Sequence, residues 1–154
     1  MLEHDLDRLR EVEFPPFRAA VAAGVASMMT AHVLFPRLDR ARPATLAPDV
    51  MNLLREELGY DGVVFSDDLE MKAVADHYQP EPLVRGCLEA GCDAVLVCSQ
   101  RDLTNEVLRL LERTPDRLLE GPLRRMVALK ERYAPAHRRR CTGWTWMARS
   151  ASAT

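Results

Sequence analysis

Three short apolar runs at nearly regular intervals constrain the fold more than any other feature of this sequence. They cover residues 27–33, 62–65 and 94–98, and they begin at intervals of 35 and 32 residues. Continuous apolar residues, rather than alternating apolar and polar ones, are typical of parallel strands that are covered on both faces. Each interval is long enough for one helix and two loops, which is the size of a strand–helix–strand unit. The spacing therefore predicts an α/β fold with a parallel sheet.

Apolar residues recur at helical spacing between and around these runs. Glycines at positions 24, 59 and 91 are placed where three of the expected helices should end. Pro15 and Pro16 predict a break between two short helices near the N-terminus, because proline inside a helix removes a hydrogen bond. The predicted helices are 5–12, 16–23, 48–59, 82–91, 103–113 and a last one that begins near residue 122.

Charge and composition exclude several classes of protein. The chain has 154 residues, and its 21 basic and 23 acidic side chains nearly balance. A nucleic-acid-binding domain usually carries a basic excess on one face, so we expect no nucleic-acid partner. No run of 18 apolar residues is present, and we therefore expect no membrane partner either.

The cysteines and the known cofactor motifs predict neither a metal nor a cofactor. Cys87, Cys92, Cys98 and Cys141 lack the spacing of zinc ligands, and three of them lie in apolar surroundings that favour buried, inert thiols. Glycine-rich loops that bind nucleotides are absent. After Tyr133 the apolar period ends, and we interpret residues 137–154 as a flexible tail that follows one folded unit, 1–136.

Candidate functional residues follow the predicted strands directly. In parallel α/β folds, functional groups gather where the carboxyl ends of the strands meet. Asp67 and Asp68 follow the second apolar run, and His32 lies at the end of the first. Because neighbouring residues of a strand point in opposite directions, we expect only one acid to face the mouth of the sheet. A structural reading stays open for each: the acids could cap a helix that begins near Leu69, and His32 could be a hydrogen-bonded structural histidine.

One long segment of the sequence resembles a known family. Residues 53–71, LLREELGYDGVVFSDDLEM, closely resemble the active-site signature of family 3 glycoside hydrolases. The ending SDDLEM, together with MMTAHVLFPRLD at 28–39 and RPATLAP at 42–48, is similar to the β-N-acetylhexosaminidase branch of that family. Enzymes of this branch remove terminal β-linked N-acetylglucosamine, typically during peptidoglycan recycling. The resemblance extends over about residues 5–136.

The resemblance implies roles for three residues. Asp67 matches the catalytic nucleophile of a retaining glycosidase, a carboxylate that forms a covalent glycosyl intermediate. Asp68 matches the second acid of the motif and implies an orienting or electrostatic role, and His32 would be a further supporting residue. The implied substrate is a glycoside or muropeptide that contains N-acetylglucosamine, the implied location is the cytoplasm, and no cofactor is implied.

The sequence also departs from the family pattern. In this branch a histidine of an Asp-Ser-His segment is the acid/base, and a Lys-His pair and an arginine contact the sugar; none of these segments is present. The three strands resemble the last three of an eightfold (β/α)8 TIM barrel, which needs about 250 residues. The resemblance therefore implies a partial barrel that is inactive alone and that needs a missing N-terminal half-barrel as its partner.

Two other functions remain open at this point. The exposed edges of a partial sheet could dock on another chain, which would make the protein a non-catalytic interaction fragment. Paired acids at a strand end also occur in receiver-like phospho-acceptor modules. Those modules need a further aspartate and a lysine at other strand ends, whereas Lys72 and Lys130 fall in predicted helices.

Overall fold

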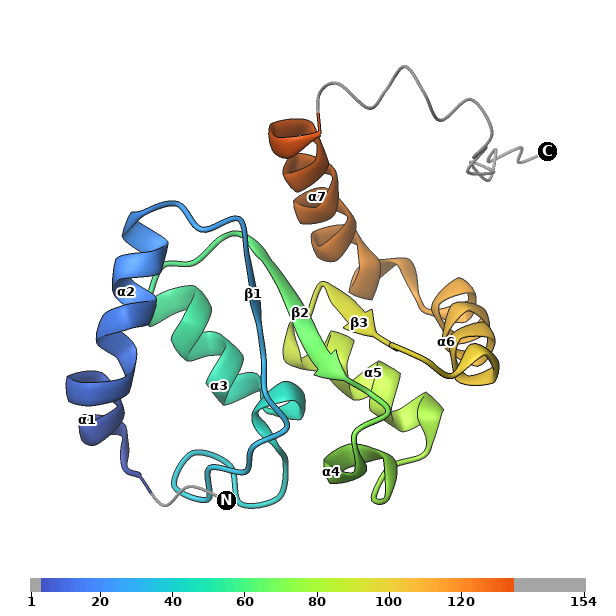
Figure 1. Cartoon of the computed structure of the whole chain (residues 1–154), viewed down its shortest axis with the longest axis horizontal. Coiled ribbons are helices and arrows are strands. Elements are labelled where there is room, and N and C mark those ends of the chain that lie inside the picture. Colours follow the sequence, from blue (N-terminus) through green and yellow to red (C-terminus); the bar gives the residue numbers. More distant parts are fainter. Residues whose placement is uncertain (1–3, 135–154) are drawn as a thin grey trace.

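All three predicted strands form, and they pair in the order of the sequence. Strands β1 (Ser27–Met29), β2 (Val63–Asp68) and β3 (Ala94–Leu96) make one parallel sheet with β2 in the centre (Figure 1). This computed structural model describes residues 4–134. The predicted parallel sheet is confirmed, although β1 and β3 are shorter than the apolar runs that indicated them. The predicted tail, 137–154, lies outside the described residues.

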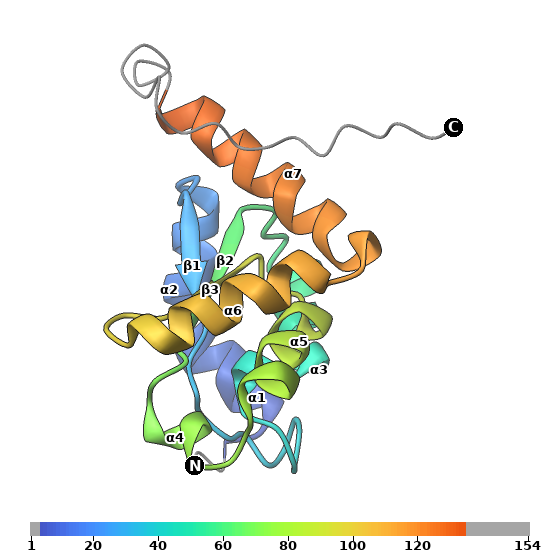
Figure 2. The same cartoon turned by 90° about the vertical axis from the view of Figure 1, so that its right-hand side faces the viewer.

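Helical segments precede β1, fill the two intervals between the strands and follow β3. They are α1 (Leu6–Arg8), the π-helical turn η1 (Leu9–Glu13), α2 (Phe14–Ala22), the 3-10 turn η2 (Ala44–Leu46), α3 (Pro48–Asn52), the π-helical turn η3 (Leu53–Glu57), α4 (Lys72–Ala75), α5 (Pro80–Ala90), α6 (Arg101–Arg113) and α7 (Asp116–Tyr133). Helices α3 and α5 lie side by side on one face of the sheet, while α4 and α7 lie near opposite ends of the strands (Figure 2). No helix within residues 4–134 combines the length and the apolar character that crossing a membrane requires.

Two predicted helix boundaries near prolines are wrong. The N-terminal helix runs from α1 through η1 into α2 without a break, and Pro15 and Pro16 lie at the start of α2, directly after the π-helical turn. The wider turn of η1 ends just before them, with the Phe14 N–H donating to the Leu9 carbonyl. Helix α7 begins at Asp116 and contains Pro122, instead of beginning there.

The three glycines end their helices as predicted. Gly24, Gly59 and Gly91 all have positive φ angles, which other residues adopt only with strain. Gly91 also has no room for a side chain, because a Cβ atom there would lie 2.7 Å from Cγ of Met51 in α3. The end of α5 is therefore fixed both by backbone conformation and by close packing.

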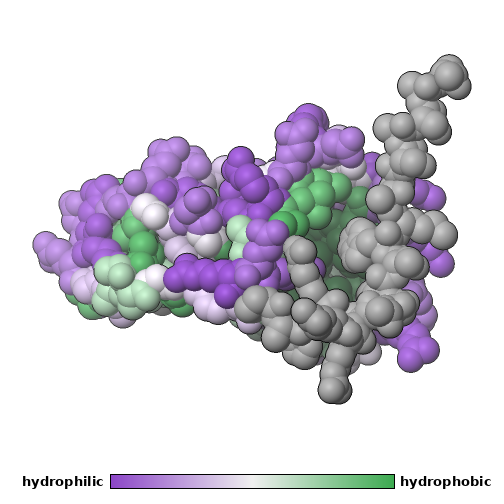
Figure 3. Space-filling view, turned by 90° about the horizontal axis from the view of Figure 1, so that it is seen from above, coloured by the Kyte–Doolittle hydropathy of each residue, from purple (hydrophilic) through white to green (hydrophobic). Residues whose placement is uncertain are grey.

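The hydrophobic core lies between β2 and the helices that cover it. Val64, Val84 and Cys87 are almost completely buried there, together with Cys92. The neighbouring Cys92 thiol and burial raise the pKa of Cys87, which agrees with the prediction of a buried, inert thiol there. The same prediction is wrong for Cys98, which is exposed because it lies beyond the end of β3. Apolar areas also remain between charged ones on the face seen from above (Figure 3). Among residues 4–134, the exposed large apolar side chains are Val12, Phe17, Met29, Met71, Leu108, Leu123, Val127 and Tyr133.

A buried carboxylate joins the sheet to two helical segments. Asp93, whose side chain is 0% exposed, accepts hydrogen bonds from Arg55 Nη2 at 2.8 Å and from Arg125 Nε at 2.8 Å. Its Oδ2 atom also accepts the main-chain N–H of Val64 at 2.8 Å. Arg55 donates further to the carbonyls of Tyr60 and Gly62. One residue thus connects η3, α7, β2 and the start of β3.

Replacing Asp93 by alanine should destabilise the fold strongly. Breaking a buried ion pair leaves unpaired charge, which costs about 3–5 kcal/mol of the free energy of unfolding. Glu89→Ala is the matched control, because it removes a carboxylate from the exposed Arg85–Glu89 pair and should cost less than about 1 kcal/mol. Urea unfolding followed by circular dichroism measures both, and Asp93→Asn should lie between them. Equal losses for Asp93→Ala and Glu89→Ala would contradict this role.

Candidate active site

A β-bulge shapes the end of the central strand. Phe65 pairs with Ala94 and Asp68 pairs with Leu96, so β2 contains one more residue than β3 between these pairs. The buried Ser66 fills the gap, because its Oγ atom accepts the Leu96 N–H at 3.0 Å. Both acids therefore lie within β2 and not after it, and strict alternation along the strand does not apply at the bulge.

Asp67 and Asp68 are half-buried at the carboxyl end of β2. The Asp68 N–H donates to Asp67 Oδ1 at 2.8 Å, and the Glu70 N–H donates to Asp68 Oδ1 at 3.1 Å. Neither acid caps a helix, since α4 begins at Lys72 and its N-cap residue is Met71. Within residues 4–134, the hydrogen bond found at the Asp67 carboxylate is made to Oδ1, and none is found at Oδ2.

His32 lies beside the same strand end, and both of its ring nitrogens are hydrogen-bonded. Nδ1 lies 3.0 Å from Oγ1 of the fully buried Thr45, and Nε2 lies 3.0 Å from the Asp68 carbonyl oxygen. The Thr45 hydroxyl also lies 2.9 Å from the Thr30 hydroxyl. The structure therefore brings His32 to the predicted acids, but it contacts the main-chain carbonyl of Asp68 rather than a carboxylate. Sequence reasoning missed Thr45.

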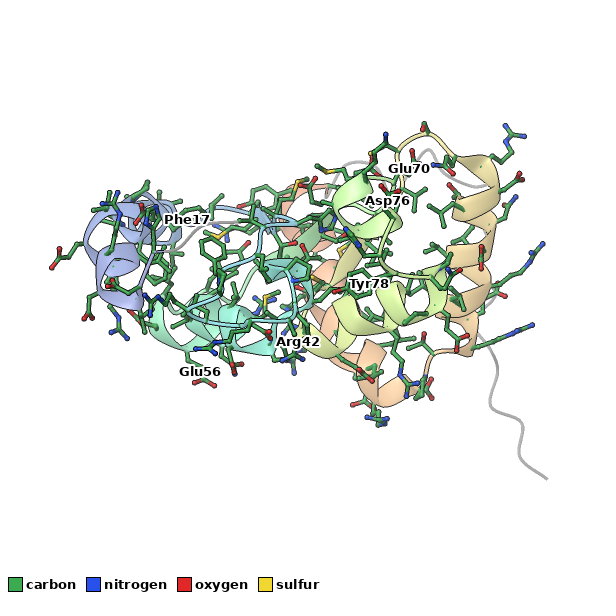
Figure 4. All side chains as sticks on the ribbon, turned by 90° about the horizontal axis from the view of Figure 1, so that it is seen from below. Phe17, Arg42, Glu56, Glu70, Asp76 and Tyr78 are labelled. Carbon is green, nitrogen blue, oxygen red and sulfur yellow. The ribbon has the colours of Figure 1, made fainter. Side chains whose placement is uncertain are left out.

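Glu70 is a second residue that sequence reasoning missed. It accepts hydrogen bonds from the N–H groups of Ser99 and Gln100, at 2.7 Å each, and from the Ser99 hydroxyl. These bonds, the one from Gln100 foremost, lower the pKa of Glu70. Glu70 thereby links the loop after β2 to the residues that precede α6 (Figure 4). No local pattern signals such a contact, because the partners are about 30 residues apart.

The end of the third strand also approaches the acids. Cys98 is exposed, and a hydrogen bond to Asp68 raises the pKa of its thiol, because the negative carboxylate opposes formation of a thiolate. Within the part of the chain that the structure describes, no group of three or more His, Cys, Asp or Glu side chains is arranged to hold a metal ion. The candidate site is therefore a carboxylate site at the carboxyl ends of the strands.

Comparison with known proteins gives the family of this chain. Residues 1–127 match the family described as "Glycosyl hydrolase family 3 N terminal domain". The "Beta-hexosaminidase" of Thiobacillus denitrificans is 44% identical over 108 residues, which cover 70% of this chain and 30% of that protein. The "Beta-hexosaminidase" of Vibrio cholerae is 38% identical over 130 residues, covering 83% of this chain and 38% of that protein. This chain belongs to glycoside hydrolase family 3.

Solved structures agree with this assignment. The family 3 β-N-acetylglucosaminidase of Paenibacillus sp. FPU-7 superposes with a TM-score of 0.80 at 40% identity, over 85% of this chain and 26% of that one. The β-N-acetylglucosaminidase of Thermotoga maritima gives 0.73 at 32% identity, over 83% and 30%. The chain spans about a third of the length of these relatives.

The receiver-like alternative finds no support, because Lys72 and Lys130 lie in α4 and α7.

The contact made by Glu70 should depend on pH. Because folding lowers its pKa, the ionised carboxylate stabilises the folded chain above its ordinary pKa of 4.5, and this stabilisation is lost as the pH falls through the lower, folded-state pKa. We expect Glu70→Gln to lower the melting temperature at neutral pH, and the difference from the unmodified chain to shrink in acid. Glu56→Gln, a change of an exposed glutamate in η3, is the control. A constant difference across the pH range would disprove the assignment.

Proposed function

We propose that this chain carries the nucleophile of a retaining glycosidase that removes terminal β-linked N-acetylglucosamine. The observation that carries the proposal is the position and the hydrogen bonding of the Asp67 carboxylate. Its carboxylate lies at the carboxyl end of the central strand, with Oδ1 held by the Asp68 N–H and Oδ2 open. The names of the relatives support the choice of sugar, and a muropeptide of the cell wall is the proposed natural substrate.

The chemistry divides into two displacements. In the first, Asp67 Oδ2 attacks the anomeric carbon, the bond to the leaving oxygen breaks, and that oxygen takes a proton from a general acid. In the second, water attacks the same carbon, its proton goes to the same group, and Asp67 is released as a carboxylate. Asp68 is proposed to orient Asp67 through its N–H and to contribute negative charge near the positive transition state.

We propose that the proton donor comes from outside the described residues. A donor belongs about 5 Å from the nucleophile, and the nearby candidates are occupied. His32 has both ring nitrogens in hydrogen bonds, and Asp68 accepts from the Glu70 N–H. We therefore propose that residues 1–136 form the last three strand–helix units of a (β/α)8 barrel, inactive alone, and that another polypeptide segment supplies the acid/base.

The edge of β1 that pairs with no other strand within residues 4–134 is the proposed contact with that segment. Beside it lies an apolar groove of about 330 Å³ between the N-terminal helix and α3, to which Phe17 and Met29 contribute. These two side chains are 48% and 55% exposed. Glu13 also lines the groove. Its Oε1 atom pairs with Arg8 Nε at 3.5 Å, whereas its buried Oε2 atom accepts no hydrogen bond within residues 4–134. An extended apolar strand with a basic side chain opposite Glu13 would satisfy all of these groups.

Co-expression tests the catalytic part of the proposal. The full chain alone should not hydrolyse 4-nitrophenyl N-acetyl-β-glucosaminide, whereas the chain co-expressed with the unmatched part of the Thiobacillus denitrificans relative should. Asp67→Asn should lower kcat at least about 10³-fold, because the nucleophile is lost. Azide should restore turnover to Asp67→Gly, because a small anion can occupy the vacated position. Asp68→Asn is the matched control and should lose less.

Two results would overturn the catalytic proposal. Robust hydrolysis by the chain alone, abolished by Asp67→Asn, would show that an acid/base lies within this chain. Full activity of Asp67→Asn in the co-expressed complex would show that Asp67 is not the nucleophile. Stable binding to the co-expressed segment without hydrolysis would instead favour the non-catalytic interaction role.

Met29→Lys tests the proposed contact surface. A charge at an apolar contact loses the free energy of burying a methionine, so we expect the affinity for the co-expressed segment to fall about 10-fold or more. The stability of the chain alone should change little, since Met29 is mostly exposed. Leu108→Lys in α6, a position 54% exposed, is the matched control and should not weaken binding. Affinity purification of the complex, quantified by the yield of the partner, measures both; equal yields would place the contact elsewhere.

A further inference from the structure

We propose that His32 is a positioning residue for Asp67, that it acts through the main chain of Asp68, and that Thr45 sets its tautomer. The proposal rests on the proposed function of Asp67 as nucleophile. It adds a relay of three side chains, Thr30, Thr45 and His32, which reaches the nucleophile without contacting the sugar. The geometry of four hydrogen bonds carries it.

The acceptor at one end of the relay determines where the protons lie. A carbonyl oxygen can only accept, so the contact between His32 and the Asp68 carbonyl requires the proton on Nε2. In the neutral imidazole Nδ1 is then an acceptor, and the Thr45 hydroxyl must donate to it. The Thr45 oxygen is left to accept from the Thr30 hydroxyl. In each hydrogen bond of the relay, the donor is therefore the group further from Asp68, beginning with the Thr30 hydroxyl.

The burial of Thr45 stabilises this arrangement of donors and acceptors. Thr45 is 0% exposed, so water does not compete for its hydroxyl. It lies in the η2 turn, which packs against α5, and its position is therefore fixed by the core rather than by the loop after β1. A hydroxyl held in this way selects one imidazole tautomer, as a buried orienting group does for other histidines.

The relay affects the nucleophile because both the carbonyl and the N–H of Asp68 are hydrogen-bonded. Its carbonyl accepts from His32 at 3.0 Å and from the Met71 N–H at 3.1 Å. Its N–H donates to Asp67 Oδ1 at 2.8 Å. A rotation of Asp68 that broke the first contact would also move the N–H away from Asp67. His32 thereby helps to keep Asp67 Oδ1 occupied and Oδ2 open for attack.

The first test uses the full chain alone and needs no activity. In nitrogen-15 NMR spectra, His32 should show a protonated Nε2 and an unprotonated Nδ1 when neutral. Hydrogen exchange of the Asp68 amide should become about 5- to 10-fold faster in His32→Leu, the loss expected for one net hydrogen bond. His32→Gln should restore slow exchange, because its side-chain amide can donate in place of Nε2.

Thr45→Val separates the hydroxyl from the shape of the side chain. It should mix the two His32 tautomers and accelerate Asp68 exchange. The matched control is Thr104→Val in α6, which removes a hydroxyl that donates to the Gln100 carbonyl and should leave both signals unchanged. A protonated Nδ1 in the unmodified chain, or unchanged Asp68 exchange in His32→Leu, overturns the proposal.

The second test measures catalysis in the co-expressed complex. A misplaced nucleophile slows the chemical step, so His32→Leu should lower kcat about 10- to 100-fold while KM stays the same. His32→Gln should recover most of the loss, which a merely destabilised protein would not do. A change in KM alone would show that His32 binds substrate and would overturn the positioning role. If Asp67→Asn stays active, the proposed function fails, and the NMR and exchange results still decide the relay.

Discussion

The buried carboxylate of Asp93 is the contact on which the rest of this structure depends. It lies at the amino end of β3 and binds two guanidinium groups and the N–H of Val64. Arg55 comes from the helical segment before β2, and Arg125 comes from α7, more than thirty residues later in the sequence than Asp93. Because a buried charge is tolerated only when it is paired, these segments cannot separate without a large cost in free energy. The amino ends of the strands are thus held by ion pairs.

The carboxyl ends are held differently, by directional hydrogen bonds around half-buried acids. Glu70 joins the loop after β2 to the residues before α6, and His32 joins the end of β1 to Asp68. Such bonds fix position without neutralising charge, so a carboxylate such as Asp67 can remain reactive. Stability and the candidate site therefore occupy opposite ends of one small sheet, as is usual where parallel strands present their carboxyl ends to a ligand.

The sequence was informative where the physical cause was local. Continuous apolar runs predicted the three strands, and glycines predicted three helix ends, because burial and positive φ angles act on residues close together in the chain. Proline misled because Pro15 and Pro16 follow the π-helical turn η1 without interrupting the N-terminal helix, and Pro122 lies inside α7. The sequence could not predict the bulge at Ser66, the burial of Thr45 or the hydrogen bonds of Glu70, because each depends on a partner at least 13 residues away.

On the proposed function, every described contact that orients Asp67 comes from within this chain. The bulge, the Asp68 N–H and the His32 relay all belong to residues 30–96, and among them only Thr30, at the far end of the relay from Asp67, lines the groove beside Phe17 and Met29. A docking segment would therefore need to bring only the proton donor to a nucleophile that is already positioned. The cost of ordering the nucleophile is met when this chain folds and not when the partner binds, which favours productive assembly.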